Sequence, residues 1–144
     1  MRLQAGEARR RFAAARVARL ATTGADGQPH LVPVTFALDD DLLYTAVDAK
    51  PKTTRQLRRL RNIRGNPRVS LLADHYQEDW DLLWWARADG HATILAAGPA
   101  IAGPARLLAE RYPQYRENPP DGPVVRVAVS RWSGWAAAGD GEQR

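Results

Sequence analysis

Apolar and polar residues alternate along most of this chain in short runs that are typical of β-strands. Clusters of glycine and aspartate between the runs, at 24–27 and 39–41, predict tight turns. The runs that predict strands are 15–22, 30–38, 42–47, 68–73, about 82–95 and 124–130. Helical spacing of apolar residues predicts helices over 4–14, about 53–65 and 99–112. The tail after Trp135 is polar, and we expect it to be loose.

The short turns between the first three predicted strands favour an antiparallel sheet over a doubly wound parallel one. Pro33 has no N–H to donate, so it predicts a sheet edge or a bulge, and Asp89-Gly90 predicts a second bulge. A closed or split barrel removes free edges from so small a sheet. We therefore predict a mainly β fold with peripheral helices, a six-stranded antiparallel split β-barrel, as a single domain over residues 1–144.

Composition narrows the class of protein. The 144 residues are 44% hydrophobic and 26% charged, an ordinary globular balance. Cysteine is absent, which excludes disulfides and thiolate metal sites. The apolar run at 92–105 is too short for a membrane span, and the first twenty residues lack the apolar stretch of a signal peptide. We expect a cytoplasmic protein with no membrane partner.

A search of the sequence for known catalytic and metal-binding motifs identifies none. Asp74 and His75 with Glu78 and Asp79 match no standard ligand spacing, so we expect a solvated acidic loop and no metal site. Nucleophile elbows, phosphate-binding glycine loops and dinucleotide fingerprints are also missing, so the sequence predicts no catalytic residue. Neighbours on a strand point to opposite faces. One of Trp84 and Trp85 must therefore face a second layer, a ligand or another subunit.

The basic residues are unevenly chosen. The chain has 21 Lys and Arg residues and a net charge of +5, but its lysines are confined to Lys50 and Lys52. In the helix that follows, Leu57, Leu60 and Ile63 share one face and Arg55, Arg58 and Arg59 the opposite one. Clustered arginines could contact nucleic acid. No nucleic-acid-binding motif accompanies them, so we expect a solvated face and no nucleic-acid partner.

The most informative combination runs from the second predicted strand to the two lysines. The proline in VPVTF leaves backbone N–H and C=O groups that a planar heterocycle can use, and Tyr44–Ala46 lies on the next strand. Lys50 and Lys52 precede a helix N-terminus, where backbone N–H groups and the helix dipole favour an anion. A ring at the strands and a phosphate at the lysines indicate a flavin-type nucleotide.

At these residues the chain resembles the split β-barrel flavin and deazaflavin oxidoreductases, the pyridoxamine-phosphate-oxidase-like superfamily with its FMN-binding split barrel. The matching stretches are ARVARLATTGADGQPHLVPVTF, LLYTAVDAKPKTTRQLRRLRNIRGNPRVSLL and VVRVAVSRWSGW, which extend from Ala15 to Trp135. Short length and the KPKTT loop look most like the actinobacterial group that uses coenzyme F420. The resemblance implies an oxidoreductase that transfers hydride between F420 and a small conjugated acceptor.

The resemblance also implies a homodimer with its cofactor at the subunit interface and a small-molecule substrate. Lys52 and Lys50 would hold the phosphate, and Arg55, Arg58 and Arg59 would suit the oligoglutamate tail of F420. Trp135, and less directly Trp132, would approach the cofactor or the partner subunit. The residues expected to line the ring are Val32, Pro33, Val34, Thr35, Thr45 and Ala46. Two alternatives remain: an FMN-dependent oxidase or flavin reductase, and a non-catalytic carrier of a cofactor or tetrapyrrole.

The lysines generate a direct test. A charge-assisted hydrogen bond contributes roughly 1.5–3 kcal/mol, so Lys52→Ala should weaken cofactor binding by at least about tenfold without unfolding the chain. Lys50→Ala should have a smaller effect. Calorimetric titration measures the affinities, and circular dichroism controls for folding. Unchanged affinity in Lys52→Ala would place the phosphate elsewhere.

Overall fold

A computed structural model describes residues 1–47 and 54–137, with the side chains of 54–57 also outside the description. One antiparallel sheet has the strand order β2–β1–β5–β6–β7–β4–β3. Its strands are β1 (Ala18–Thr23), β2 (Pro29–Val34), β3 (Ala37–Asp39), β4 (Leu42–Ala46), β5 (Arg68–His75), β6 (Trp84–Leu95) and β7 (Val124–Ala136). The helices are α1 (Ala5–Ala14), α2 (Thr54–Gly65), α3 (Ala102–Arg111) and α4 (Pro113–Glu117), with 3-10 turns η1 (Trp80–Leu82) and η2 (Pro99–Ile101).

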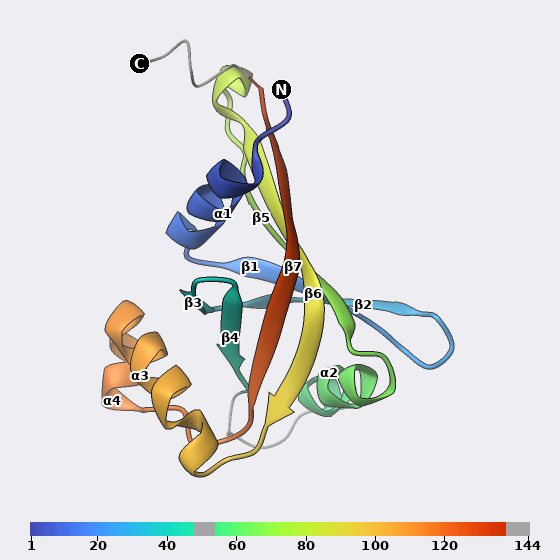
Figure 1. Ribbon diagram of the computed structural model, residues 1–144, viewed down its shortest axis with the longest axis vertical. Coiled ribbons are helices and arrows are strands. Elements are labelled where there is room, and N and C mark those ends of the chain that lie inside the picture. Colours follow the sequence, from blue (N-terminus) through green and yellow to red (C-terminus); the bar gives the residue numbers. More distant parts are fainter. Residues whose placement is uncertain (48–53, 138–144) are drawn as a thin grey trace.

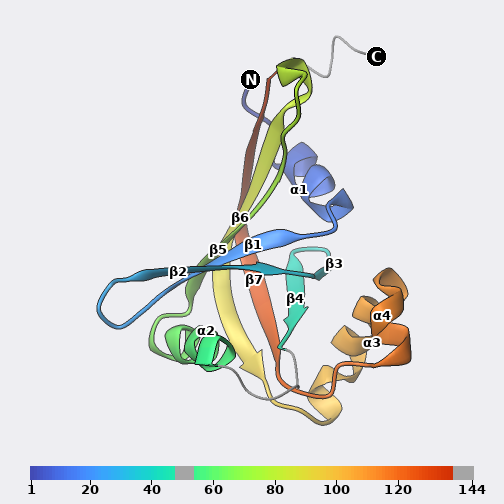
Figure 2. The ribbon, with the colours of Figure 1, turned by 180° about the vertical axis from the view of Figure 1, so that it is seen from behind.

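Strands β5, β6 and β7 form a long twisted ribbon around which the other elements are arranged (Figure 1). Helix α1 packs on the upper half of the ribbon, and α2 lies against β6 and β1 near its lower end. Helices α3 and α4 lie on the side of the molecule opposite α2, beside β3 and β4, as the reverse view confirms (Figure 2). The apolar core lies between these elements and includes Phe12, which contacts the rings of Phe36 and Trp132 at centroid distances of 4.9 and 5.3 Å.

The predicted mainly β, antiparallel class is confirmed, but the described residues form a seven-stranded sheet where six strands were expected. The predicted strand 30–38 is divided into β2 and β3 because the backbone N–H of Phe36 donates to the hydroxyl of Tyr112, 3.1 Å away, and not to a neighbouring strand. Strand β2 is an edge strand, as Pro33 predicted. The bulge at Asp89-Gly90 is also confirmed, where the register between β6 and β7 shifts.

The helices differ from prediction in one place that shapes the site. The expected helix over 99–112 begins as a 3-10 turn and ends at Arg111, and Pro113 then opens a further short helix, α4. Proline suits the first position of a helix because the N–H that it lacks would have no partner there.

The last strand continues past the predicted end at 130 to Ala136. None of the helices in the described ranges is long and apolar enough to cross a membrane.

Trp84 and Trp85 point to opposite faces of the ribbon, as predicted. Trp84 packs against the core, with the Arg11 guanidinium 5.8 Å from its ring centroid. Trp85 lies on the other face, where Arg87 is 5.6 Å from its ring. The two sides of the ribbon therefore have different surroundings, one covered by α1 and one exposed.

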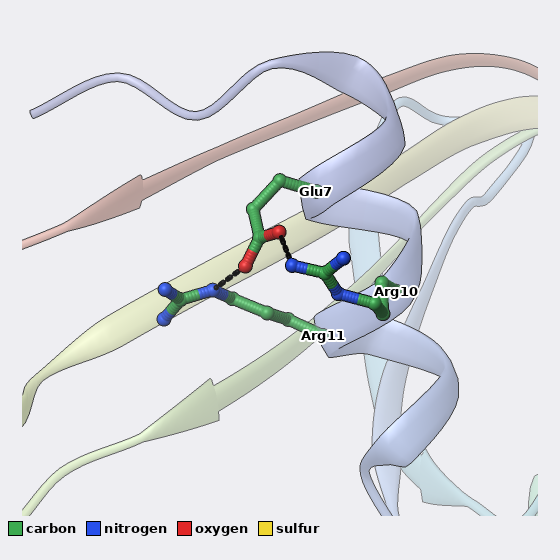
Figure 3. Close-up of polar contacts among 3 residues, drawn as sticks. All are labelled: Glu7, Arg10 and Arg11. Carbon is green, nitrogen blue, oxygen red and sulfur yellow. Dashed lines mark hydrogen bonds and ion pairs between the residues drawn. The ribbon is translucent and has the colours of Figure 1, made fainter. Parts of the chain in front are cut away.

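Helix α1 is organised by Glu7, whose carboxylate accepts hydrogen bonds from Arg10 and Arg11 in the next turn (Figure 3). The Arg11 Nε to Glu7 Oε2 distance is 2.8 Å. The hydrogen bond from Arg11, and then the positive charge of both arginines, lowers the pKa of the Glu7 carboxyl. Glu7 thus stays ionised, and its contribution to stability persists, until the pH falls through this lowered pKa.

Tyr112, at the junction of α3 and α4, joins segments that are distant in the sequence. Its buried hydroxyl accepts from the N–H of Phe36 and lies 3.0 Å from the carbonyl oxygen of Phe36 and 2.9 Å from that of Arg16, either of which can accept its proton. This contact fixes the end of α3 against the β2–β3 link and the segment before β1.

Tyr112→Phe should lower the free energy of unfolding by about 1–3 kcal/mol, because a buried N–H and two carbonyls lose a partner. Tyr76→Phe is the matched control, since Tyr76 is 66% exposed and its change should be within about 0.5 kcal/mol. Urea denaturation followed by fluorescence compares them. Equal stability of the two variants would show that the Tyr112 hydroxyl does not fix α3.

Candidate cofactor groove

A groove of about 880 Å³ opens where the end of β2 approaches β4. Pro33, Val34 and Thr35 form one part of its wall, and Thr45, Ala46 and Val47 form another. Strands β2 and β3 lie at opposite ends of the hydrogen-bonded order but are joined by two residues, so the sheet must curl until these edges approach. This curling brings together five of the six residues expected to line a ring.

The opposite wall comes from α4 and the segment before β7, and no pattern in the sequence predicted it. Its residues are Gln114, Tyr115, Glu117, Asn118, Pro119, Pro120 and Asp121. The hydroxyls of Thr35 and Tyr115 lie 3.0 Å apart and join the two walls by a hydrogen bond. The available signal was Pro113, which directly follows the helix predicted over 99–112 and is the first residue of α4.

Arg59 supplies the groove with a positive charge. Its side chain lines the groove from α2, and within the described ranges its buried Nε has no hydrogen-bond partner. Burial lowers the pKa of this guanidinium from its ordinary value. A buried donor without an acceptor is costly, and an anion in the groove would supply one.

The position of Arg59 corrects the sequence analysis, which placed it on a solvated face with Arg58. Arg58 is exposed, but Arg59 precedes the buried Ile63 by four residues and therefore lies on the same side of the helix. The exposed arginine face of α2 therefore includes Arg58 but not Arg59. Arg59 belongs to the edge of the buried face, where it reaches the groove.

A family model described as pyridoxamine 5'-phosphate oxidase matches residues 5–136, which includes every element of this fold. The chain belongs to the pyridoxamine 5'-phosphate oxidase family. Membership confirms the predicted resemblance at the level of the superfamily and supports the general class of oxidoreductase.

Individual relatives of this family member differ in what they share with it. An FAD-binding protein of Mesorhizobium loti is 25% identical, with a TM-score of 0.69 over 93% of both chains. A conserved hypothetical protein of Mycobacterium tuberculosis is 26% identical, with a TM-score of 0.74 over 94% of this chain and 86% of that one. A 5a,11a-dehydrotetracycline/5a,11a-dehydrooxytetracycline reductase of Streptomyces rimosus is 38% identical over 56 residues, which spans 39% of this chain and 38% of that relative.

The remaining predicted site residues of this oxidase-family chain that the structure describes do not line the groove. Val32 is buried in the core and does not line the groove. Trp132 donates to Asp41 across 2.9 Å, a bond that lowers the pKa of the Asp41 carboxyl. Trp135 lies near the far end of β7 and is 37% exposed. The predicted Lys50 and Lys52, and the side chain of Arg55, fall outside the described residues.

Proposed function

We propose that this protein is a reductase that binds a flavin-type coenzyme in the groove, that the coenzyme is F420, and that the acceptor is a small conjugated molecule. The observation that carries the proposal is the meeting, in one groove, of five residues expected at the ring with Arg59, whose buried Nε has no partner among the described residues. When bound, the coenzyme supplies hydride chemistry, while the protein binds and orients the reactants.

The size and lining of the groove suit such a ligand. Its volume of about 880 Å³ lies within the usual range of roughly 300–1,000 Å³ for small-molecule sites. Pro33, Val34 and Ala46 offer apolar contact to a ring, and the buried Thr45 offers a hydroxyl at its edge. These side chains would hold the ring and exclude water from one of its faces.

The charged residues of the groove indicate which end of the coenzyme lies at which side. Glu117 and Asp121 lie on the α4 side of the groove and would repel a phosphate, whereas Arg59 on α2 would attract one. Lys50 and Lys52 follow Val47, a groove residue, within the segment that leads to α2. The phosphate end of the coenzyme is therefore assigned to the α2 side and the ring to the ends of β2 and β4.

The sequence and one relative favour the proposed reductase, and a second relative favours the alternative. The exposed Arg58 beside Arg59 suits the anionic tail that F420 has and FMN lacks. The Streptomyces relative is named as a reductase, which favours reduction of a conjugated acceptor. The Mesorhizobium relative is named as FAD-binding, which favours the alternative of a flavin protein of the same fold.

Paired titrations of FMN and F420 test the site and the coenzyme together. Arg59→Gln should weaken both ligands by about tenfold or more, because each loses a charge-assisted hydrogen bond. Arg61→Gln, on the exposed side of the same helix, is the matched control and should change neither. Arg58→Gln should weaken F420 alone, and less so at high salt.

Equal affinities of wild type and Arg59→Gln for both ligands would refute the groove as the coenzyme site. Tighter binding of FMN than of F420 would favour the flavin alternative. Binding of F420 without turnover of any conjugated acceptor would favour a carrier.

We also propose that the functional unit is a homodimer. Trp135 lies ten residues along β7 from Val125, the partner of Thr45 at the groove. At about 3.3 Å per residue this separation is on the order of 30 Å, so Trp135 can approach a coenzyme only in the groove of a second copy. Tyr76 and Trp80, at the same end of the ribbon, are 66% and 74% exposed and offer apolar contact area.

Light scattering at micromolar concentration should give twice the chain mass of 16.0 kDa, because an interface of well over ~1,000 Å² is expected. Trp80→Ser should shift the protein towards monomer. Leu31→Ser, at a 66% exposed side chain of β2 that does not line the groove, is the control and should not. A monomer that binds coenzyme with full affinity would contradict the dimer.

A further inference from the structure

A second cavity of about 520 Å³ adjoins the cofactor groove. The two share Thr35, Gln114 and Tyr115, so the hydrogen bond between Thr35 and Tyr115 lies at their common wall. The rest of the second cavity is lined mainly by apolar surface, from Val17, which is 41% exposed, and Pro113 among others. Its position beside the groove means that an occupant would lie next to whatever the groove holds.

Two arginines border this apolar cavity, Arg16 and Arg111. Within the described ranges neither forms an ion pair, whereas Arg9, Arg19 and Arg87 each meet an aspartate. Two like charges beside apolar surface, with no acidic partner, repel each other and favour a bound anion.

Both guanidinium groups are held in place by other contacts. Arg111 lies 4.7 Å from the centroid of Phe36 and donates through Nη2 to the carbonyl oxygen of Ala15. Arg16 donates to the carbonyl oxygen of Arg111 across 3.1 Å and lies 5.9 Å from the ring of Tyr112. The buried Nε of Arg111 has no partner among the described residues. The positions are preorganised, and one donor still lacks an acceptor.

We propose that this cavity binds a small organic anion with an apolar ring body, its acidic oxygen at Arg16 and Arg111 and its body against Val17, Pro113 and Tyr115. Because the cavity shares a wall with the groove, the occupant is the acceptor substrate, and that step rests on the proposed function. A neutral molecule would leave the two cations uncompensated. The acceptor is therefore a conjugated acid, with an electrophilic carbon that can accept hydride and a separate anionic group.

A matched pair of fluorescent probes tests the anion requirement without the coenzyme. 1-Anilinonaphthalene-8-sulfonate carries a ring body and one negative charge, and N-phenyl-1-naphthylamine has the same body without the charge. The sulfonate should bind the folded dimer more tightly than the amine. Arg16→Gln and Arg111→Gln should each weaken the sulfonate by about tenfold, the loss of one charge-assisted hydrogen bond, and leave the amine unchanged.

Arg106→Gln is the matched control, since Arg106 is an exposed arginine of α3 that does not line the cavity. Circular dichroism and urea titration test whether each variant is folded. Arg111→Gln is the variant more at risk of unfolding, because the guanidinium of Arg111 also packs on Phe36. Arg16→Gln removes a side chain at the surface and keeps the test valid if Arg111→Gln is unstable.

Separate measurements distinguish this proposal from the proposed function. FMN should bind Arg16→Gln as it binds wild type, and the sulfonate should still bind when FMN is saturating. Full displacement of the sulfonate by FMN, or equal weakening in Arg106→Gln, would overturn the anion site. If Arg16→Gln changes the mass measured by light scattering but leaves the affinity for the sulfonate unchanged, a second copy covers the cavity and the anion site is overturned. If wild type binds neither F420 nor FMN but still binds the sulfonate, only the coenzyme assignment is overturned.

Discussion

The hydroxyl of Tyr112 lies where three segments meet: the β2–β3 link, the chain before β1 and the corner between α3 and α4. Its contacts with the backbone of Phe36 keep β2 and β3 from forming one strand. Tyr112 also directly precedes Pro113, the first residue of α4, and α4 contributes Gln114 and Tyr115 to both the groove and the second cavity. The geometry of both binding regions therefore depends on one buried phenol.

Sequence patterns predicted the elements whose stability comes from repeated burial. Alternation identified β1, β4 and β5 to within a few residues, and helical spacing identified α1 and α2. The patterns did not predict α4, because a five-residue helix has too few apolar positions to show a period. They also missed the break at Phe36, since the partner of its N–H is a side chain 76 residues away.

The candidate site was predictable to a similar extent. Residues of β2 and β4 could be assigned to a ring site from their order along the chain and the family that they resemble, and the groove includes most of them. Val32 and Val34 are equally apolar and lie on the same face of β2, but only Val34, nearer the end of the strand, reaches the groove. This difference depends on where the sheet curls, and the local pattern of apolar and polar residues does not predict that position.

Arginine has several distinct roles in this chain, and composition alone conceals them. On α1, β1 and the ribbon, arginines meet Asp41, Asp74 and Asp89, and these partly exposed pairs contribute little to stability. Arg59 and Arg111 line cavities, and in the part of the chain that the structure describes their buried Nε atoms have no hydrogen-bond partner. A buried unsatisfied donor lowers the stability of the fold unless a ligand supplies the acceptor. Since the fold tolerates this cost at two cavities that share a wall, the anion binding proposed on both sides of the Thr35–Tyr115 contact would account for both arginines at once.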